Sequence, residues 1–148
     1  MADAAFLDVN VFMYAAGTPH SYKDVCVKIL SDVETGALAT VIDSEILQEI
    51  LYRYTYLKLA DKAVQMCRDI LALPITVLPV AEADVRLAVD VFESHHAVGL
   101  KPRDAIHAAC MKNNGLSRLI SADGDFDHLS FVTRVDPMNY EKAFAQGA

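Results

Sequence analysis

The chain has 148 residues, of which 53% are hydrophobic, and it carries a formal net charge of −7. A chain of this length usually forms one domain and buries roughly 70% of its unfolded surface, so we expect a single domain over residues 1–148. The negative charge argues against a broad basic surface that binds nucleic acid through phosphate contacts alone. It leaves open an enzyme whose acidic site is neutralised by metal.

The cysteine pattern and the hydrophobic runs indicate where the chain resides. Cys26, Cys67 and Cys110 lie far apart in apolar stretches and lack the spacing of a zinc site. We expect reduced core residues, which are typical of a cytoplasmic protein. The N-terminus lacks the basic start and long apolar stretch of a signal peptide. The longest nearly apolar run, over residues 70–81, contains two prolines and is too short to cross a bilayer, so no membrane partner is expected.

Strand and helix patterns alternate along the first half of the chain. Phe6 and Leu7 are typical of a short buried strand, and a first helical turn is expected over residues 10–15. Thr18 and Pro19 are preferred residues at a helix start and predict a helix that runs to about residue 34. The elements expected next are a strand over 37–42, helices over 44–58 and 60–71, and a strand over 75–78.

The second half continues the alternation. An apolar stripe predicts a helix over residues 80–95, followed by a loop to residue 100. A helix rich in small residues opens at residues 101–104 and stops at residues 113–115, which read Asn-Asn-Gly. We then expect strands over 118–121 and 133–135, a turn over 122–125, and a terminal helix from Pro137 that frays after Phe144. This order predicts an α/β three-layer sandwich with a central, mostly parallel sheet.

Four acidic residues share one kind of position in this scheme. Asp8 follows the first strand inside an apolar run, where an ionised carboxylate is costly to bury unless it is paired. Glu49 lies in the helix after the second strand, Asp104 in the first turn of a helix, and Asp123 directly after a strand. Ligands of α/β sheets bind outside the carboxyl ends of the strands. Clustered carboxylates select Mg²⁺ or Mn²⁺, and such a site can activate water toward a phosphoryl group.

Each acid also has a purely structural interpretation. Asp8 can cap the helix that follows it, and Asp104 suits the N-terminal end of a helix. Glu49 can form a weak surface pair with Arg53 one turn later. Asp123 is a common turn residue. The placement of all four at strand exits and helix starts is what makes the set indicative of a site.

Four motifs occur in order between Phe6 and Pro137, and together they resemble those of one known family. They cover residues 6–11, 42–51, 103–109 and 119–126. The family is that of PIN domains, in particular the VapC-like toxin ribonucleases of toxin–antitoxin pairs. The resemblance implies a metal-dependent endoribonuclease with a central parallel sheet, a homodimer, and a small antitoxin protein that occupies the acidic groove.

The resemblance also implies roles for individual residues. The catalytic quartet would be Asp8, Glu49, Asp104 and Asp123, with the three aspartates as ligands of Mg²⁺ or Mn²⁺. The supporting residues would be Asn10, Ser121 and Asp125. Glu45 remains an alternative to Glu49, although the spacing from the preceding strand favours Glu49. Lys101 and Arg103, beside Asp104, can contact the phosphates of an RNA substrate or belong to a solvated loop.

Histidines and tyrosines offer further candidates with competing interpretations. A general acid is conceivable among His95, His96 and His107, but the adjacent pair suits a loop and His107 suits a packed helix. Bases can stack on tyrosines, but helical spacing assigns most of them to the core or to an interface; these are Tyr14, Tyr52, Tyr54 and Tyr56. The helix over residues 45–59 is rich in Leu, Ile and Tyr and by itself predicts a dimer interface.

Other functions fit the sequence less well. A haloacid-dehalogenase-type phosphatase needs a second Asp two residues after the first, where this chain has Asn10. A receiver domain needs an acidic N-terminal pair, at which only Asp3 and Asp8 hint, together with a mid-chain acceptor Asp and a late Lys. A non-catalytic interaction module with the same fold, and an RNA-processing nuclease outside a toxin–antitoxin pair, remain alternatives.

Overall fold

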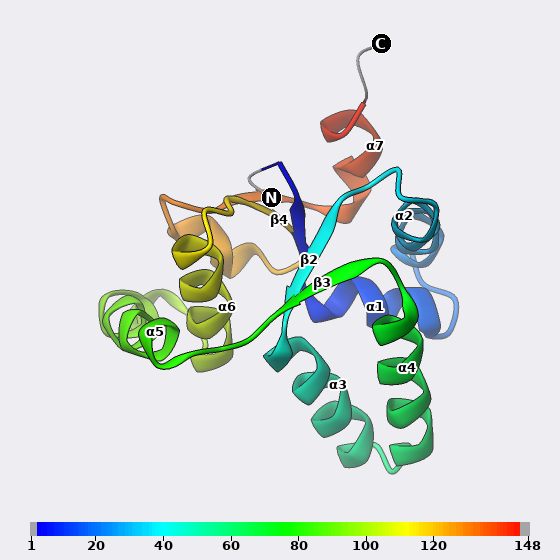
Figure 1. Cartoon of the computed structure of the whole chain (residues 1–148), viewed down its shortest axis with the longest axis horizontal. Helices are drawn as coiled ribbons and strands as arrows, with labels where there is room; N and C mark the ends of the chain where they lie inside the picture. Colours follow the sequence, from blue (N-terminus) through cyan, green and yellow to red (C-terminus); the bar gives the residue numbers. More distant parts are fainter. Residues whose placement is uncertain (1–2, 146–148) are drawn as a thin grey trace.

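The computed structural model describes residues 3–145, and these residues form a five-stranded sheet with helices on both faces (Figure 1). The strands are β1 (Ala5–Leu7), β2 (Thr40–Asp43), β3 (Ile75–Leu78), β4 (Arg118–Ile120) and β5 (Thr133–Val135). All neighbouring strands run parallel, in the order β3-β2-β1-β4-β5. The predicted α/β sandwich is confirmed, and the described sheet is parallel throughout.

Helices cover the two faces of the sheet unequally. They are α1 (Val9–Ala16), α2 (Lys23–Thr35), α3 (Ser44–Tyr56), α4 (Ala60–Ala72), α5 (Glu82–His95), α6 (Pro102–Asn113) and α7 (Tyr140–Ala143), with 3₁₀ turns at His96–Val98, Gly124–His128 and Pro137–Asn139. Figure 1 shows α5 and α6 on one side of the strands and α1, α2 and α4 on the other. Along the described chain, the helices are too short or too polar to cross a membrane.

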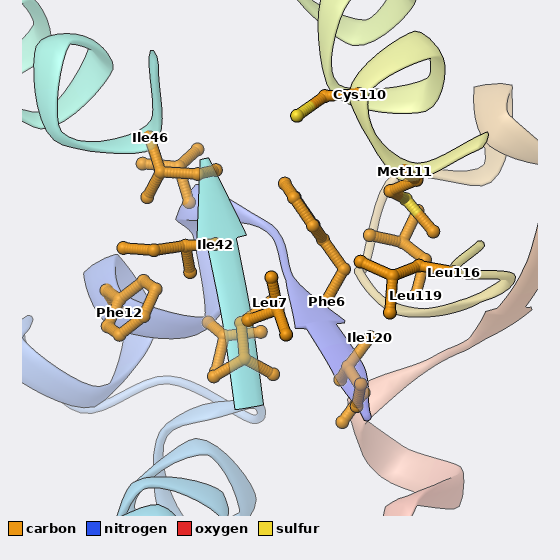
Figure 2. Packing of buried hydrophobic residues seen from close by; sticks show 14 of the residues in the cluster. Phe6, Leu7, Phe12, Ile42, Ile46, Cys110, Met111, Leu116, Leu119 and Ile120 are labelled. Atoms are coloured by element: carbon orange, nitrogen blue, oxygen red, sulfur yellow. The ribbon is translucent and has the colours of Figure 1, made fainter. Parts of the chain in front are cut away.

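The short central strand β1 is buried on both faces. Phe6 and Leu7 have no exposed surface, and their side chains point to opposite faces because successive residues alternate along a strand. Figure 2 shows apolar side chains packed on both sides of this strand, among them Phe12, Ile42, Ile46, Met111, Leu116 and Leu119. Truncating a buried aromatic ring typically costs about 3–5 kcal/mol. This packing therefore fixes β1 and the residue that follows it, Asp8.

The three cysteines lie in the core as free thiols, as the sequence predicts. Cys26, Cys67 and Cys110 are all buried and unpaired within the described chain. Burial raises the pKa of Cys26 to about 11 and that of Cys110 to about 12. A thiol becomes a nucleophile or a metal ligand only as the thiolate, so these residues act as small apolar side chains.

Helix α2 begins later than the sequence predicts. The expected start at Thr18 and Pro19 is wrong, because both residues lie in a bend and the helix begins at Lys23. Aromatic packing shapes this connection: the rings of His20 and Tyr22 stack on the ring of Tyr14, with centroids 4.7 and 5.0 Å away. Tertiary packing overrides a local start signal, which is only a weak preference.

The chain end is more compact than the single terminal helix that the sequence predicts. Residues 137–139 form a 3₁₀ turn, and the short helix α7 follows. The hydroxyl of Tyr140 donates to Asp32 Oδ2 on α2 at 2.7 Å, which attaches this segment to the domain. The expected fraying after Phe144 falls mainly on residues 146–148, which lie outside the described residues.

The strand order brings three chain segments to one edge of the sheet. The order reverses at β1, which has β2 on one side and β4 on the other. Ligands of open parallel sheets bind at such a switch point, outside the carboxyl ends of the strands. The backbone N–H of Asp8 donates to the carbonyl of Ile120 at 3.1 Å, which keeps the exit of β1 beside that of β4. Asp8, Asp43 and Ser121 therefore lie at the same edge.

Candidate active site

A cavity of about 520 Å³ opens at this carboxyl edge. Its walls come from the exit of β1, from α3, from the first turn of α6 and from the turn after β4. The acids that line it are Asp8, Glu49, Asp104 and Asp123. Further lining residues are Asn10, Tyr14, Arg53, Lys101 and Arg103. The structure thus brings together four carboxylates that are far apart in the sequence.

Asp8 is held in one orientation by several donors. It is 4% exposed, and its Oδ1 accepts from the Val9 N–H at 2.8 Å. Its Oδ2 accepts from Ser121 Oγ at 2.6 Å and from Asn10 Nδ2 at 3.2 Å. Burial raises the pKa of Asp8, although the nearby His107 and the hydrogen bonds counteract this effect. The carboxyl group of Asp8 therefore caps α1, and the same residue lines the cavity.

The turn after β4 links Asp123 to this network. The Asp123 N–H donates to Ser121 Oγ at 3.0 Å, and Asp123 Oδ1 accepts from the Asp125 N–H at 2.9 Å. Asp123 is therefore both a turn residue and a lining residue. Asp125 falls outside the described residues that line the cavity, and its Oδ2 lies 3.3 Å from Lys101 Nζ. Its position fits a role in holding Lys101 at the cavity mouth.

Asp104 carries the least compensated charge of the site. It is 9% exposed, and within the described chain its Oδ2 has no hydrogen-bond partner. Burial, and then the charges of Asp8 and Asp123, raise the pKa of Asp104 to about 7. Carboxylates that share a buried site repel each other, and a proton or a cation must resolve the conflict. The first turn of α6 thus holds a buried carboxyl oxygen that lacks a partner, on a residue that lines the cavity together with further acids.

Glu49 contacts a buried histidine as well as an arginine. Its Oε2 lies 2.8 Å from Arg53, and its Oε1 lies 3.5 Å from His107 Nε2. The other ring nitrogen, Nδ1, is 2.7 Å from Asp43 Oδ2. Burial opposes the ionisation of Glu49, but His107 and Arg53 outweigh it and lower the pKa of Glu49. Burial likewise opposes the charged imidazolium, but Asp43 and Glu49 outweigh it and raise the pKa of His107 to about 10.

The two glutamates of α3 occupy different environments. Glu45 is partly exposed and lies 3.8 Å from Arg103 Nε. Glu49 is 6% exposed and lines the cavity. The weak pair with Arg53 that the sequence predicts does form, but it does not keep Glu49 out of the site. Between the two alternatives, the geometry favours Glu49.

Residues 5–132 match the family model described as "PIN domain". The match contains every residue that lines the cavity. The chain belongs to the PIN domain family.

Known relatives of this PIN domain have similar lengths. It is 34% identical to ribonuclease VapC13 of Mycobacterium tuberculosis over 130 residues, which cover 87% of this chain and 97% of that protein. The solved structure of VapC20 from the same organism, described as a Sarcin-Ricin loop cleaving toxin, has a TM-score of 0.74 at 16% identity and covers 87% and 97% of the two chains. DNA-bound VapBC from Salmonella typhimurium has a TM-score of 0.68 at 13% identity, with 90% and 98% covered. At these identities the solved structures show a shared fold.

The donor set of this PIN domain fits a hard divalent cation. Asp8, Asp104 and Asp123 present carboxylate oxygens to one cavity, and Mg²⁺ and Mn²⁺ prefer such ligands. A cation there would relieve the repulsion that raises the pKa of Asp104. Ligand atoms of Asp8, Glu49 and His107 also lie within 4.8 Å of one another. The raised pKa of His107 favours the protonated imidazole, which has no lone pair to offer, so the carboxylates are the better candidates for ligands.

Sequence reasoning misses two members of this network. The sequence marks Asp43 only as a helix start, and Asp43 Oδ1 does cap α3 by accepting from the Ile46 N–H at 3.2 Å. Its second oxygen contacts His107. The prediction of His107 as a packed helix residue is confirmed, because the side chain is 1% exposed, but it also joins two acids. A signal was present, since Asp43 is a further acid at the end of a strand.

Cationic side chains surround the mouth of the cavity. Lys101 and Arg103 line it, and so does Arg53, which sequence reasoning considers only as a partner of Glu49. The guanidinium of Arg103 also lies over the ring of Tyr52, 5.8 Å from its centroid. The overall negative charge of the chain therefore does not prevent a local attraction for anionic groups at this edge.

Proposed function

We propose that this chain is a single-domain, metal-dependent endoribonuclease that acts in the cytoplasm as the toxin of a toxin–antitoxin pair. The observation that carries the proposal is the buried Oδ2 of Asp104, which lacks a partner within the described chain while Asp8 and Asp123 face the same cavity. The similarity to proteins named VapC ribonucleases supports the choice of RNA as substrate.

The chain's own residues would divide the work as follows. Asp8, Asp104 and Asp123 would hold Mg²⁺ or Mn²⁺, and the bound ion supplies a Lewis acid that polarises a phosphoryl oxygen and lowers the pKa of bound water. Ser121 keeps the carboxylate of Asp8 oriented through a 2.6 Å hydrogen bond. Glu49 is ionised at neutral pH because its pKa is lowered. It can therefore accept a hydrogen bond from the attacking water and orient it.

Binding of the RNA backbone would fall to the cations at the cavity mouth. Arg53, Lys101 and Arg103 can approach the phosphates next to the scissile bond. Tyr14 lines the same cavity and presents an aromatic ring on which a base can stack. These contacts are to phosphates and to the face of a base, which every RNA sequence offers. Any preference for an RNA sequence therefore depends on the shape of the groove.

Metal dependence is the direct test of this function. The purified protein is expected to cut RNA oligonucleotides with Mn²⁺ or Mg²⁺, to stop when EDTA is added, and to resume when excess Mn²⁺ is restored. Labelled RNA resolved on a denaturing gel measures the cleavage. The double variant Asp8→Asn/Asp104→Asn, purified in the same way, measures contaminating nucleases. Equal cleavage by this variant would remove the proposal, and a lack of cleavage across a broad RNA set would favour a non-catalytic interaction module.

A small antitoxin protein is proposed as the partner because one of the similar solved structures is a VapBC complex. Expression of the chain alone should arrest growth, and coexpression of the small protein encoded next to its gene should relieve the arrest. RNA cleavage without growth arrest would instead favour an RNA-processing enzyme that works outside such a pair.

A homodimer is proposed from the exposed apolar surface of α3 and the loop after it. Tyr52 and Tyr56 are 58% and 80% exposed, and the other apolar residues of this surface are Leu51, Leu57 and Leu59. Tyr52 and Tyr56 are therefore candidates for an interface and are not core residues, whereas Tyr54 is buried in the core. Large exposed apolar patches mark interaction sites.

Disrupting this surface should produce monomers. Tyr56→Glu places a charge in the middle of the proposed interface, where it would be desolvated without a partner. Light scattering coupled to gel filtration is expected to show a dimer for the wild type and half that mass for Tyr56→Glu. Met138→Glu, at an exposed apolar residue on a 3₁₀ turn, is the matched control and should remain dimeric. A wild type that is monomeric at all concentrations would contradict the dimer.

A further inference from the structure

His107 connects three elements behind the wall of the cavity. It lies on α6, and its ring contacts the end of β2 through Asp43 and the middle of α3 through Glu49. The ring also packs against Phe6 of β1, with centroids 5.7 Å apart. It is not among the described residues that line the cavity. The residue is therefore placed to act on the site through its neighbours and not by touching substrate.

The carboxylate of Glu49 has two partners of different rigidity. Arg53 contacts Oε2, but its side chain is 49% exposed, and long exposed side chains hold a geometry poorly. His107 faces Oε1 from the core, where a side chain has little freedom. Of these two partners in the described chain, the histidine is therefore the better placed to fix the direction in which the Glu49 carboxylate enters the cavity.

Asp43 in turn fixes the ring of His107. One Asp43 oxygen is 2.7 Å from Nδ1, and the other accepts the backbone N–H of Ile46 at 3.2 Å. A carboxylate bound to one ring nitrogen sets the orientation of the ring, and hence the direction of the other nitrogen. Nε2 lies 3.5 Å from Glu49 Oε1, a charge contact and not a hydrogen bond, since Nε2 has no hydrogen-bond partner in the described chain.

We propose that His107 is a positioning residue that holds Glu49 Oε1 in the acidic cavity, and that Asp43 orients His107 for this task. The inference rests on the proposed function, in which the Glu49 carboxylate orients the attacking water beside the cation. A carboxylate oxygen of Glu49 also lies within 4.8 Å of a carboxylate oxygen of Asp8, so a displaced Glu49 would take negative charge away from the cation site and should weaken cation binding even in the absence of RNA.

Two amide substitutions distinguish the roles of the two ring nitrogens of His107. The side-chain nitrogen of asparagine reaches the place of Nδ1, and that of glutamine reaches the place of Nε2. His107→Asn therefore keeps a donor to Asp43 and loses the nitrogen that lies near Glu49, whereas His107→Gln does the reverse. A role confined to the packing of α6 would make the two variants equivalent, or would favour His107→Asn because it keeps the shorter contact.

Titration of the metal-free protein with MnCl₂ in a calorimeter tests the proposal. We expect His107→Asn to weaken Mn²⁺ binding by about tenfold, the lower end of the range that is typical for residues behind metal ligands. His107→Gln keeps the group that faces Glu49 and loses only the contact with Asp43, so it should weaken Mn²⁺ binding by less. In a Glu49→Gln background, His107→Asn should have no further effect on Mn²⁺ affinity. With RNA, His107→Asn should lower kcat and leave KM unchanged.

The outcomes distinguish this inference from the function on which it rests. Equal Mn²⁺ affinities for the two amide variants, or additive losses with Glu49→Gln, would overturn the role of His107. Mn²⁺ binding without RNA cleavage by the wild type would overturn the proposed function alone, and a wild type that binds no Mn²⁺ would overturn both. If His107→Asn does not fold, Asp43→Asn serves as the second variant. It keeps the cap of α3 and should also weaken Mn²⁺ binding, although residue 43 does not line the cavity.

Discussion

Asp104→Asn is expected to abolish RNA cleavage and, at the same time, to stabilise the metal-free protein at neutral and alkaline pH. The carboxylate is a proposed cation ligand, and its loss should cost more than the roughly 10–100-fold that is typical of residues behind the ligands. Stability should move in the opposite direction, because Asp104 is buried beside Asp8 and Asp123 and its Oδ2 lacks a partner in the described chain. A residue held only for folding would lose both properties together.

The stability gain should depend on pH in a defined way. The pKa of Asp104 is about 7 in the folded protein, whereas the ordinary pKa of this side chain, expected in the unfolded chain, is 3.8. The folded protein therefore binds this proton more tightly, and ionisation lowers the free energy of unfolding as pH rises from about 4 to about 7. Asparagine does not ionise, so the variant escapes a loss on the order of a few kcal/mol, at ~1.4 kcal/mol per pKa unit.

Urea denaturation in EDTA at pH 4.5 and pH 8, together with cleavage of labelled RNA in Mn²⁺, measures both effects. Asp90→Asn changes an exposed acid on α5 and should alter neither the activity nor the pH dependence of stability. An Asp104→Asn variant that is less stable than the wild type at pH 8 would contradict the cost assigned to this carboxylate. One that still cuts RNA at the wild-type rate would contradict its place in the site.

The positions of Asp8 and Asp123 could be predicted because both lie just after a strand. Asp8 directly follows β1, and Asp123 is the third residue after β4. The carboxyl ends of parallel strands lie at one edge of the sheet, so residues that follow such strands are expected at that edge. The sequence separates Glu49 from Glu45 only weakly. Glu45 and Glu49 are one turn apart on the same side of α3, and local spacing can only favour one of them. Burial separates them, because Glu49 lies next to His107 while Glu45 is partly exposed.

The Asp43–His107 pair could not be derived from local patterns. The two residues are 64 positions apart, and their contact depends on how α6 packs against the end of β2. An Asp at a helix start and a His on an apolar helix face each have a sufficient local explanation, so neither calls for the other. The same limit explains the wrong start of α2, where the stacking of His20 and Tyr22 on Tyr14 decides the path of the chain.

Asp43→Asn is expected to lower the free energy of unfolding by about 3–5 kcal/mol near pH 6, the usual cost of removing one partner from a buried ion pair. The substitution keeps the cap of α3, since asparagine is a good capping residue, but among the described residues it leaves Glu49, at 3.5 Å, as the one carboxylate within 4 Å of the His107 imidazolium. Asp43→Ala should cost about 1 kcal/mol more at every pH because it also removes the cap. Urea denaturation at pH 6, 8 and 10 measures these differences.

The pH dependence identifies the charge on His107 as the cause. The pKa of His107 is raised from 6.5 to about 10 in the folded protein. A raised pKa contributes stability that is fully present below the unfolded value of 6.5 and is lost as pH rises through about 10. The gap between wild type and Asp43→Asn should therefore be widest near pH 6 and should narrow toward pH 10. A gap that stays constant over this range would assign the role of Asp43 to neutral hydrogen bonding and packing, and His107 would then be an uncharged member of the core.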